Sequence, residues 1–190
     1  MSTNHSPIAT RSPNRSRTST SGIPKPSSRK SFSNSPLRDH NVAIVSSSKK
    51  EPTTFCWGKN RDGELSMGCV KDFKVPKATK GIRGAVVQNI SSGREHSAVV
   101  TNDGKIYVCG SYLHGKLGIE DLRAVNVLQF HPIPTLETKI IRQVACGDYH
   151  TLALLEDGHV YAWGGSLFKK LGKRGDSGLG PSLVLALSKK

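Results

Sequence analysis

Two histidines and two aspartates recur at one spacing in this chain of 190 residues. His96 and His150 lie 54 residues apart, and so do Asp103 and Asp157. These residue types act as general bases and bind metal ions, so they are the first candidates for chemistry. Neither histidine has a cysteine or carboxylate at metal-ligand spacing, and each aspartate precedes a glycine, as turn residues do. We therefore interpret all four as structural.

The remaining reactive residues show no catalytic pattern either. The four cysteines, Cys56, Cys69, Cys109 and Cys146, form no C-x-x-C pair and fit small apolar positions of a protein from a reducing compartment. The glycines form no phosphate-binding loop, and no G-x-S-x-G sequence is present. We expect no enzyme activity, no catalytic residue, no metal and no cofactor.

The segments that carry these residues form an internal repeat of two copies. Residues 93–100 reappear as residues 147–154, and each copy continues through Asp-Gly, at Asp103-Gly104 and Asp157-Gly158, into a second apolar run. Two short runs joined by Asp-Gly predict a β-hairpin, because its tight primed turn needs positive φ. Gly93 and Gly147 end a preceding strand candidate, where glycine permits a sharp reversal.

A glycine-punctuated turn follows each hairpin. Residues 110–118 match residues 164–172, and an earlier partial copy spans residues 57–68, which gives three turns but only two Gly-x-x-His hairpins. A period just above 50 with strands throughout predicts an all-β fold, a partial β-propeller of about two to three four-stranded blades. The structural repeat positions are Trp57, Gly58, Gly93, His96, Asp103, Gly104, Gly110, Gly147, His150, Asp157, Gly158, Trp163 and Gly164.

The combined motif resembles the regulator of chromosome condensation repeat over roughly residues 55–172. Trp57-Gly58 with Gly63 and Gly68 carries the resemblance, as does Gly147-x-x-His150 followed by Trp163-Gly164. Three positions depart from the pattern: Ser66 replaces a glycine, Cys109 replaces the usual tryptophan, and Lys169 stands where the other copies have glycine.

The resemblance implies a seven-bladed propeller, of which this sequence supplies about two and a half blades. We expect a truncated chain; the alternatives are an open array and a ring completed by other chains. The best-known member of the family promotes nucleotide exchange on the small GTPase Ran and binds chromatin through a basic tail, whereas other members are scaffolds. A plant member of the family senses ultraviolet light through clustered tryptophans. That role does not apply here, because Trp57 and Trp163 are isolated, one per repeat.

From this resemblance we expect a non-enzymatic protein-interaction module. The first alternative is a guanine-nucleotide exchange factor for a Ran-like small GTPase, which would need more blades. The second is a chromatin-binding protein that acts mainly through its N-terminal tail. The expected partners are a protein, for which a small GTPase is the candidate, and nucleic acid or chromatin bound through the tail.

The expected tail, residues 1–52, is basic and rich in serine and proline. It holds nine Lys or Arg against two acids, and fourteen serines, with few apolar residues to bury, so we expect it to be disordered. Repeats would follow over 53–172, with an irregular segment over 173–190. The candidate polyanion-binding residues are Arg11, Arg15, Arg17, Lys25, Arg29, Lys30 and Arg38. Ser6, Ser12 and Ser35 precede prolines and are candidate phosphorylation sites whose charge would weaken polyanion binding.

No apolar run approaches the roughly 20 residues of a membrane span, and no apolar segment near Met1 resembles a secretory signal. We expect a cytoplasmic or nuclear protein. Organelle import is the alternative, because residues 1–38 contain no acid and are rich in arginine and serine.

Overall fold

The computed structural model describes residues 40–45, 53–79, 82, 85–120, 125–165, 170–172 and 179–188, with the backbone alone for 40–45 and 53. Strands and single turns of 3-10 helix are the regular elements of this part of the chain. The strands are β1 (His40–Val45), β2 (Thr53–Gly58), β3 (Phe73–Ala78), β4 (Val87–Ser92), β5 (His96–Thr101), β6 (Ile106–Gly110), β7 (Val127–Pro132), β8 (Ile141–Cys146), β9 (His150–Leu155), β10 (Val160–Gly164) and β11 (Ser182–Leu183). The 3-10 turns are η1 (Leu113–Gly115), η2 (Pro134–Leu136) and η4 (Leu185–Leu187).

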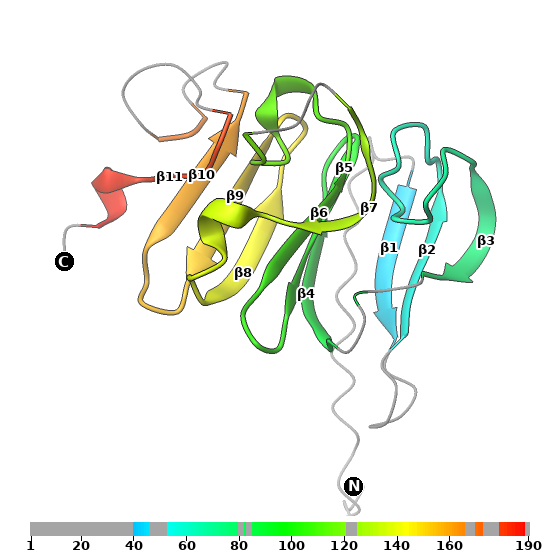
Figure 1. The fold of residues 1–190 in the computed structure, drawn as a ribbon, viewed down its shortest axis with the longest axis horizontal. Coiled ribbons are helices and arrows are strands. Elements are labelled where there is room, and N and C mark those ends of the chain that lie inside the picture. The colour runs from blue at the N-terminus through cyan, green and yellow to red at the C-terminus, as the bar shows by residue number, and fades with distance from the viewer. Residues whose placement is uncertain are drawn as a thin grey trace, which may run out of the picture.

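These strands form three antiparallel sheets that stand side by side in chain order (Figure 1). The first sheet has the order β1-β2-β3, the second β4-β5-β6-β7, and the third β11-β10-β9-β8. Each sheet is a meander of neighbouring strands, which short apolar runs separated by glycine turns favour. The predicted fold class, an all-β array of about two to three blades, is confirmed.

The hairpin turns differ from the expected tight primed form. Between β5 and β6, Gly104 N–H donates to the Thr101 carbonyl at 2.9 Å, and Gly104 alone of the loop residues has positive φ, 78°. This is a three-residue loop with glycine in the left-handed position, a common hairpin type. The second hairpin repeats it, with Gly158 at φ 86° and its N–H donating to Leu155.

Beyond the two Gly-x-x-His hairpins of the sequence, the described chain contains a third strand in the register of the histidine strands. In β1, His40 pairs with Gly58 as His96 pairs with Gly110. Two features hide this copy in the sequence: Leu37 takes the place of the repeat glycine, and the connection from β1 to β2 is longer than the one from β5 to β6. The expected disordered tail is therefore corrected at residues 40–45, and its other residues lie outside the described part.

The C-terminal segment also differs from expectation. Residues 173–190 were expected to be irregular, but Ser182 and Leu183 form β11 and pair with Ala162 and Tyr161 of β10. This strand gives the third sheet its fourth member. The two-residue strand is too short to show an alternating pattern in the sequence, and its pairing comes from the neighbouring β10.

The apolar core lies between the sheets. One cluster joins the second and third sheets and contains Val108, Val144 and Trp163; another joins the first and second and contains Cys56 and Val99. All six residues of β5 are buried because its sheet is covered on both faces. In β9 only alternate residues are fully buried, so one face of the third sheet is partly open in the described part of the chain.

Candidate protein-interaction site

The first predicted histidine sits where the second and third sheets meet. His96 is fully buried, and its Nε2 lies 2.9 Å from Oγ1 of Thr151 on the next sheet. Thr151 Oγ1 donates to the Lys116 carbonyl at 2.9 Å, which uses its only hydrogen. His96 Nε2 therefore carries a proton and donates to Thr151. The histidine holds one sheet against the next.

His150 has the same place in the third sheet but is half-buried. Burial, together with nearby Lys170, lowers the pKa of His150. Its Nδ1 atom is buried and has no hydrogen-bond partner within the described residues.

The two predicted aspartates are exposed in separate hairpins. Asp157 Oδ2 lies 3.0 Å from His159 Nδ1, and the hydrogen bonds from His159 lower the pKa of the Asp157 carboxyl. The neighbouring Asp157 Oδ1 accepts the His159 N–H, which is the bond of a turn-forming aspartate.

The cysteines are unsuited to nucleophilic chemistry. Burial raises the pKa of the Cys56 thiol to about 12 and raises that of Cys109 well above its ordinary value. Each thiol donates to a backbone carbonyl, Cys56 to Leu65 and Cys109 to Glu64. The reactive form of cysteine is the thiolate, which these surroundings disfavour.

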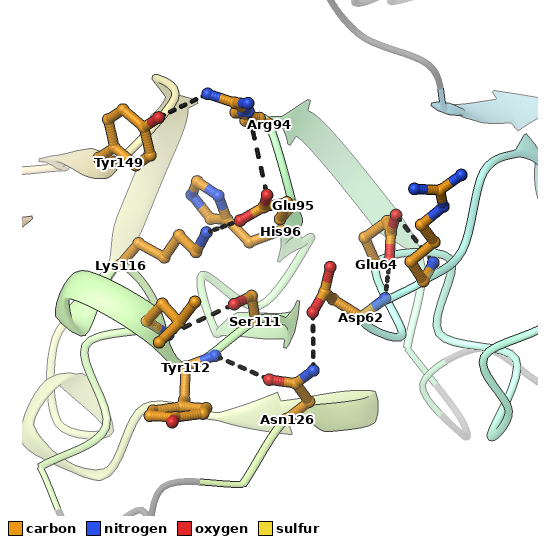
Figure 2. A network of polar contacts seen from close by, with 12 residues as sticks. Asp62, Glu64, Arg94, Glu95, His96, Ser111, Tyr112, Lys116, Asn126 and Tyr149 are labelled. Atoms are coloured by element: carbon orange, nitrogen blue, oxygen red, sulfur yellow. Dashed lines mark hydrogen bonds and ion pairs between the residues drawn. The ribbon is translucent and has the colours of Figure 1, made fainter.

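A polar cluster lies where three loops converge. These are the β4–β5 loop, the β8–β9 loop and the segment that follows β6, and all three leave the same end of their sheets because the strands alternate in direction. Figure 2 shows Arg94, Glu95, Lys116 and Tyr149 gathered there. We call these four residues the Arg94–Tyr149 cluster.

A buried ion pair anchors this cluster. Lys116 has no exposed side-chain surface, and its Nζ lies 2.7 Å from Oε2 of Glu95, which is 33% exposed. This hydrogen bond and the lysine charge lower the pKa of the Glu95 carboxyl. A buried charge is stable only when paired, so the pair fixes Glu95 at the surface.

Glu95 and Tyr149 in turn position an exposed guanidinium. Arg94 Nη1 donates to the Tyr149 hydroxyl at 2.5 Å, and the guanidinium carbon lies 5.7 Å from the centre of the tyrosine ring. Arg94 Nε lies 3.9 Å from Glu95 Oε1, and the arginine side chain is 54% exposed. The cluster thus presents a half-exposed cation in a held orientation, which suits recognition of a carboxylate or phosphate.

His114 completes the rim of the cluster. Its ring stands edge-on to Tyr149 with the centroids 5.0 Å apart. Its φ is 63°, a left-handed conformation that costs a non-glycine residue about 1–2 kcal/mol. Strained backbone of this kind is enriched at functional sites.

A second polar network fixes the loop beneath the cluster. Asn126 Nδ2 donates to Asp62 Oδ1 at 2.8 Å, and its own Oδ1 accepts the Tyr112 N–H at 3.3 Å (Figure 2). Glu64 is buried and accepts the Asp62 N–H at 2.8 Å. Burial raises the pKa of Glu64. These bonds tie the first sheet's turn to the segment between β6 and β7.

Sequence reasoning missed the members of the Arg94–Tyr149 cluster. Arg94-Glu95 and Asp148-Tyr149 are the two positions inside Gly-x-x-His that differ between copies. A repeat keeps its architectural residues and varies its surface, so this difference was the available signal. The candidate polyanion-binding and phosphorylation residues of the tail all lie outside the described residues.

Within the described part of the chain, no group of three or more His, Cys, Asp or Glu is placed to hold a metal ion. No helix in the same part is long and apolar enough to cross a membrane. The Arg94–Tyr149 cluster offers a positioned positive charge for binding a carboxylate or phosphate.

The fold and the repeated inter-sheet contacts define a propeller-type repeat protein. Residues 53–100 and 103–154 match the Regulator of chromosome condensation (RCC1) repeat, and a second description of the same repeat matches residues 87–115 and 141–168. The chain belongs to this family, as its motifs predicted.

Three relatives illustrate the range of proteins that carry the repeat. The secretion-regulating guanine nucleotide exchange factor of Bos taurus is 36% identical over 130 residues, which is 66% of this chain and 28% of the relative. The ultraviolet-B receptor UVR8 of Arabidopsis thaliana is 32% identical over 116 residues, or 61% and 26% of the two chains. The human E3 ubiquitin-protein ligase HERC2 is 32% identical over 130 residues, which is 67% of this chain and 3% of the relative. The chain thus spans less than a third of these relatives, and its matched part consists of repeats.

Solved structures share the fold. One is the structure of Prp20p from Saccharomyces cerevisiae, which was described with its binding to Gsp1p and histones. Its TM-score is 0.67 at 23% identity, and the matched region is 77% of this chain and 36% of the Prp20p chain. Human WBSCR16 also has a TM-score of 0.67, at 21% identity, and the matched region is 76% of this chain and 35% of the WBSCR16 chain.

Proposed function

We propose that this chain is a non-enzymatic protein-interaction module that contacts its partner through the Arg94–Tyr149 cluster. The observation that supports this proposal is the fixed orientation of the Arg94 guanidinium. Arg94 is half-exposed yet bonded to Tyr149, while Glu95 beside it is fixed by buried Lys116. A pre-positioned arginine loses little freedom on binding, and Arg and Tyr are enriched among residues that dominate interface energies. The partner surface would be acidic.

The test compares Arg94→Glu with the matched control Arg142→Glu. Arg142 is an exposed arginine in β8, near the strand end opposite the β8–β9 loop, so both variants carry the same charge change. Proteins cross-linked to each variant in cells would be quantified by mass spectrometry. Selective loss with Arg94→Glu supports the proposal, and an equal loss with both variants would reject it.

The second candidate function is guanine-nucleotide exchange on a small GTPase. It is supported by similarity to the Bos taurus exchange factor and by the fold shared with Prp20p. The test is release of a fluorescent nucleotide from a panel of purified small GTPases, Ran-like proteins included. Accelerated release that Arg94→Glu abolishes would favour exchange over simple binding, and an unchanged release rate across the panel would exclude it.

A further inference from the structure

The Tyr149 hydroxyl is a second hydrogen-bond donor beside the Arg94 guanidinium, and the two groups meet at the ends of neighbouring sheets (Figure 2). Arg94 Nη1 donates to the Tyr149 oxygen at 2.5 Å, and a guanidinium has no acceptor to offer the hydroxyl in return. The single hydrogen of the hydroxyl therefore points away from Arg94, and no described residue accepts it. Two donors on adjacent side chains can thus bind one ligand.

The guanidinium also keeps donors for a ligand. Arg94 Nε lies 3.9 Å from Glu95 Oε1, which is beyond hydrogen-bond distance. Within the described part of the chain, the hydrogen bond to Tyr149 is the one that the guanidinium makes. A guanidinium has five N–H groups in a planar fork, so several of them stay available on its half-exposed side.

The charges of the cluster leave a single positive charge. Lys116 and Glu95 neutralise each other across 2.7 Å, and the pKa of the Glu95 carboxyl is lowered, so Arg94 provides the remaining charge at neutral pH. The flanking Asp148 and Lys170 act in opposite directions on the neighbouring histidine and offset each other. A carboxylate balances one positive charge, whereas a phosphate of about −1.5 to −2 would leave excess negative charge beside Glu95.

Exposed leucine side chains adjoin the cluster. Leu113 is 46% exposed and precedes His114, whose ring stands against Tyr149. Leu179 is 60% exposed, and its Cα lies 3.1 Å from the position that a Cβ on Gly115 would take, so it lies against the next residue of the same turn. A ligand whose carboxylate reaches the cluster therefore meets apolar surface beside it.

We propose that the ligand of this site is a peptide segment in which an aspartate or glutamate adjoins an apolar residue. The carboxylate accepts hydrogen bonds from Arg94 and from the Tyr149 hydroxyl, and the apolar side chain packs against Leu113. This inference rests on the proposed function, because it names the group that the Arg94–Tyr149 cluster recognises. Tyr149 is then a donor to the ligand as well as a support for Arg94.

The test titrates the full chain, labelled with ¹⁵N, with short Gly-Ser peptides that have Asp-Leu, Asn-Leu or phosphoserine-Leu at their centre. Binding is followed by NMR at the Arg94 Nε–H signal. We expect the Asp-Leu peptide to bind about tenfold more tightly than the Asn-Leu peptide, which is the effect of a hydrogen bond to an ionised group. The phosphoserine peptide should bind more weakly than the Asp-Leu peptide.

Two substitutions test the roles of the individual side chains. Tyr149→Phe keeps the ring and removes the O–H donor, so it should weaken binding of the Asp-Leu peptide about tenfold. Tyr161→Phe makes the same change at a half-buried position within β10 and should bind as the wild type. Leu113→Ser should weaken binding of the Asp-Leu peptide but not of an Asp-Ser peptide, with Val125→Ser at another exposed apolar position as the control. Circular dichroism of each variant verifies folding.

The outcomes separate this proposal from the proposed function. Tighter binding of the phosphoserine peptide overturns the carboxylate assignment and leaves the proposed function intact. Equal binding of the Asp-Leu and Asn-Leu peptides, or wild-type affinity in Tyr149→Phe, also overturns the proposal, as does the absence of saturable binding by the Asp-Leu peptide. In each of these cases the cross-linking comparison of Arg94→Glu with Arg142→Glu decides the proposed function on its own. Wild-type binding of the Asp-Leu peptide by Arg94→Glu would overturn both.

Discussion

At the scale of single residues, the buried Lys116 connects architecture with surface. Its carbonyl accepts the Trp163 indole N–H, while its ammonium pairs with Glu95. One residue thereby fixes both the contact between two sheets and the loop that presents Arg94. Removing the carboxylate leaves an unpaired buried charge, whereas removing both charges does not.

The Glu95–Lys116 pair predicts a specific dependence of stability on pH. Because the folded-state pKa of Glu95 is lowered from about 4.5, its contribution is full above that value and is lost as pH falls through the lowered folded-state pKa. We expect Glu95→Gln to destabilise the protein by about 1–3 kcal/mol at neutral pH and progressively less in acid. Thermal unfolding of wild type and variant between neutral and acidic pH measures this. A destabilisation that does not change with pH would contradict the assignment, and Lys116→Met should cost less than Glu95→Gln.

We expect two departures from the family motif to compensate each other. Cys109 occupies the tryptophan position and donates to the Glu64 carbonyl, as Trp163 donates to Lys116. Ser66 occupies the glycine position, with φ 56°. In the next repeat Trp163 packs over the corresponding Gly118, so we expect the small residue at position 109 to leave room for the Ser66 side chain.

The compensation is testable with a double-mutant cycle. We expect Cys109→Trp to destabilise the chain by about 1–3 kcal/mol, because the indole would overlap the Ser66 side chain. In a Ser66→Gly background the same substitution should cost less, with a coupling of about 0.5–3 kcal/mol. Urea unfolding of the four proteins gives the coupling. Additive effects would show that the two sites are independent.

At the scale of elements, β1 changes the description of the N-terminal region. Its backbone pairs with β2 along all six residues, in the register of the histidine strands β5 and β9. A strand of this kind belongs to the folded array, so the boundary between tail and repeats lies before residue 40.

Proline substitutions test whether β1 contributes to stability. Successive N–H groups of a strand point to opposite sides, so one of Val42→Pro and Ala43→Pro must remove a hydrogen bond to β2. We expect that variant to lower the urea midpoint clearly. Ser47→Pro, between β1 and β2, is the control and should have little effect. If neither strand variant differs from the control, β1 is not part of the stable fold.

At the scale of the whole molecule, the net charge of +14 is shared between the tail and the repeats. The seven candidate polyanion-binding residues all precede β1, so their charge is separated along the chain from the Arg94–Tyr149 cluster. We propose that the tail binds polyanions while the repeats bind protein.

Salt dependence measures this division. Replacing the seven basic tail residues by glutamine should weaken binding to duplex DNA and flatten its slope with log salt, which scales as about 0.9 per phosphate contacted. Lys74→Gln and Lys77→Gln, on exposed β3 positions, are controls for the loss of charge in the repeats. An unchanged slope in the tail variant, or an equal change in the controls, would place DNA binding elsewhere. Glutamate at Ser6, Ser12 and Ser35 should weaken binding in the same direction if the tail is the site.

The sequence by itself determined the repeat, the strand content and the family. Glycines, hairpin turns and alternating apolar residues act locally, so Gly104, Gly158 and the strands beside them are readable from neighbouring residues. His96 and His150 could be recognised as structural rather than catalytic histidines because they recur at the same position of the repeat. These properties depend on short-range conformational preference and periodicity.

The tertiary structure decided the rest. Arg94 and Tyr149 are 55 positions apart, and only the packing of one sheet on the next brings the guanidinium to the hydroxyl. β1 and β11 lack a complete local signal and are strands because β2 and β10 pair with them. Contacts between distant segments depend on how whole sheets pack, and no local pattern contains that information. For that reason the candidate site came from the structure and the architecture from the sequence.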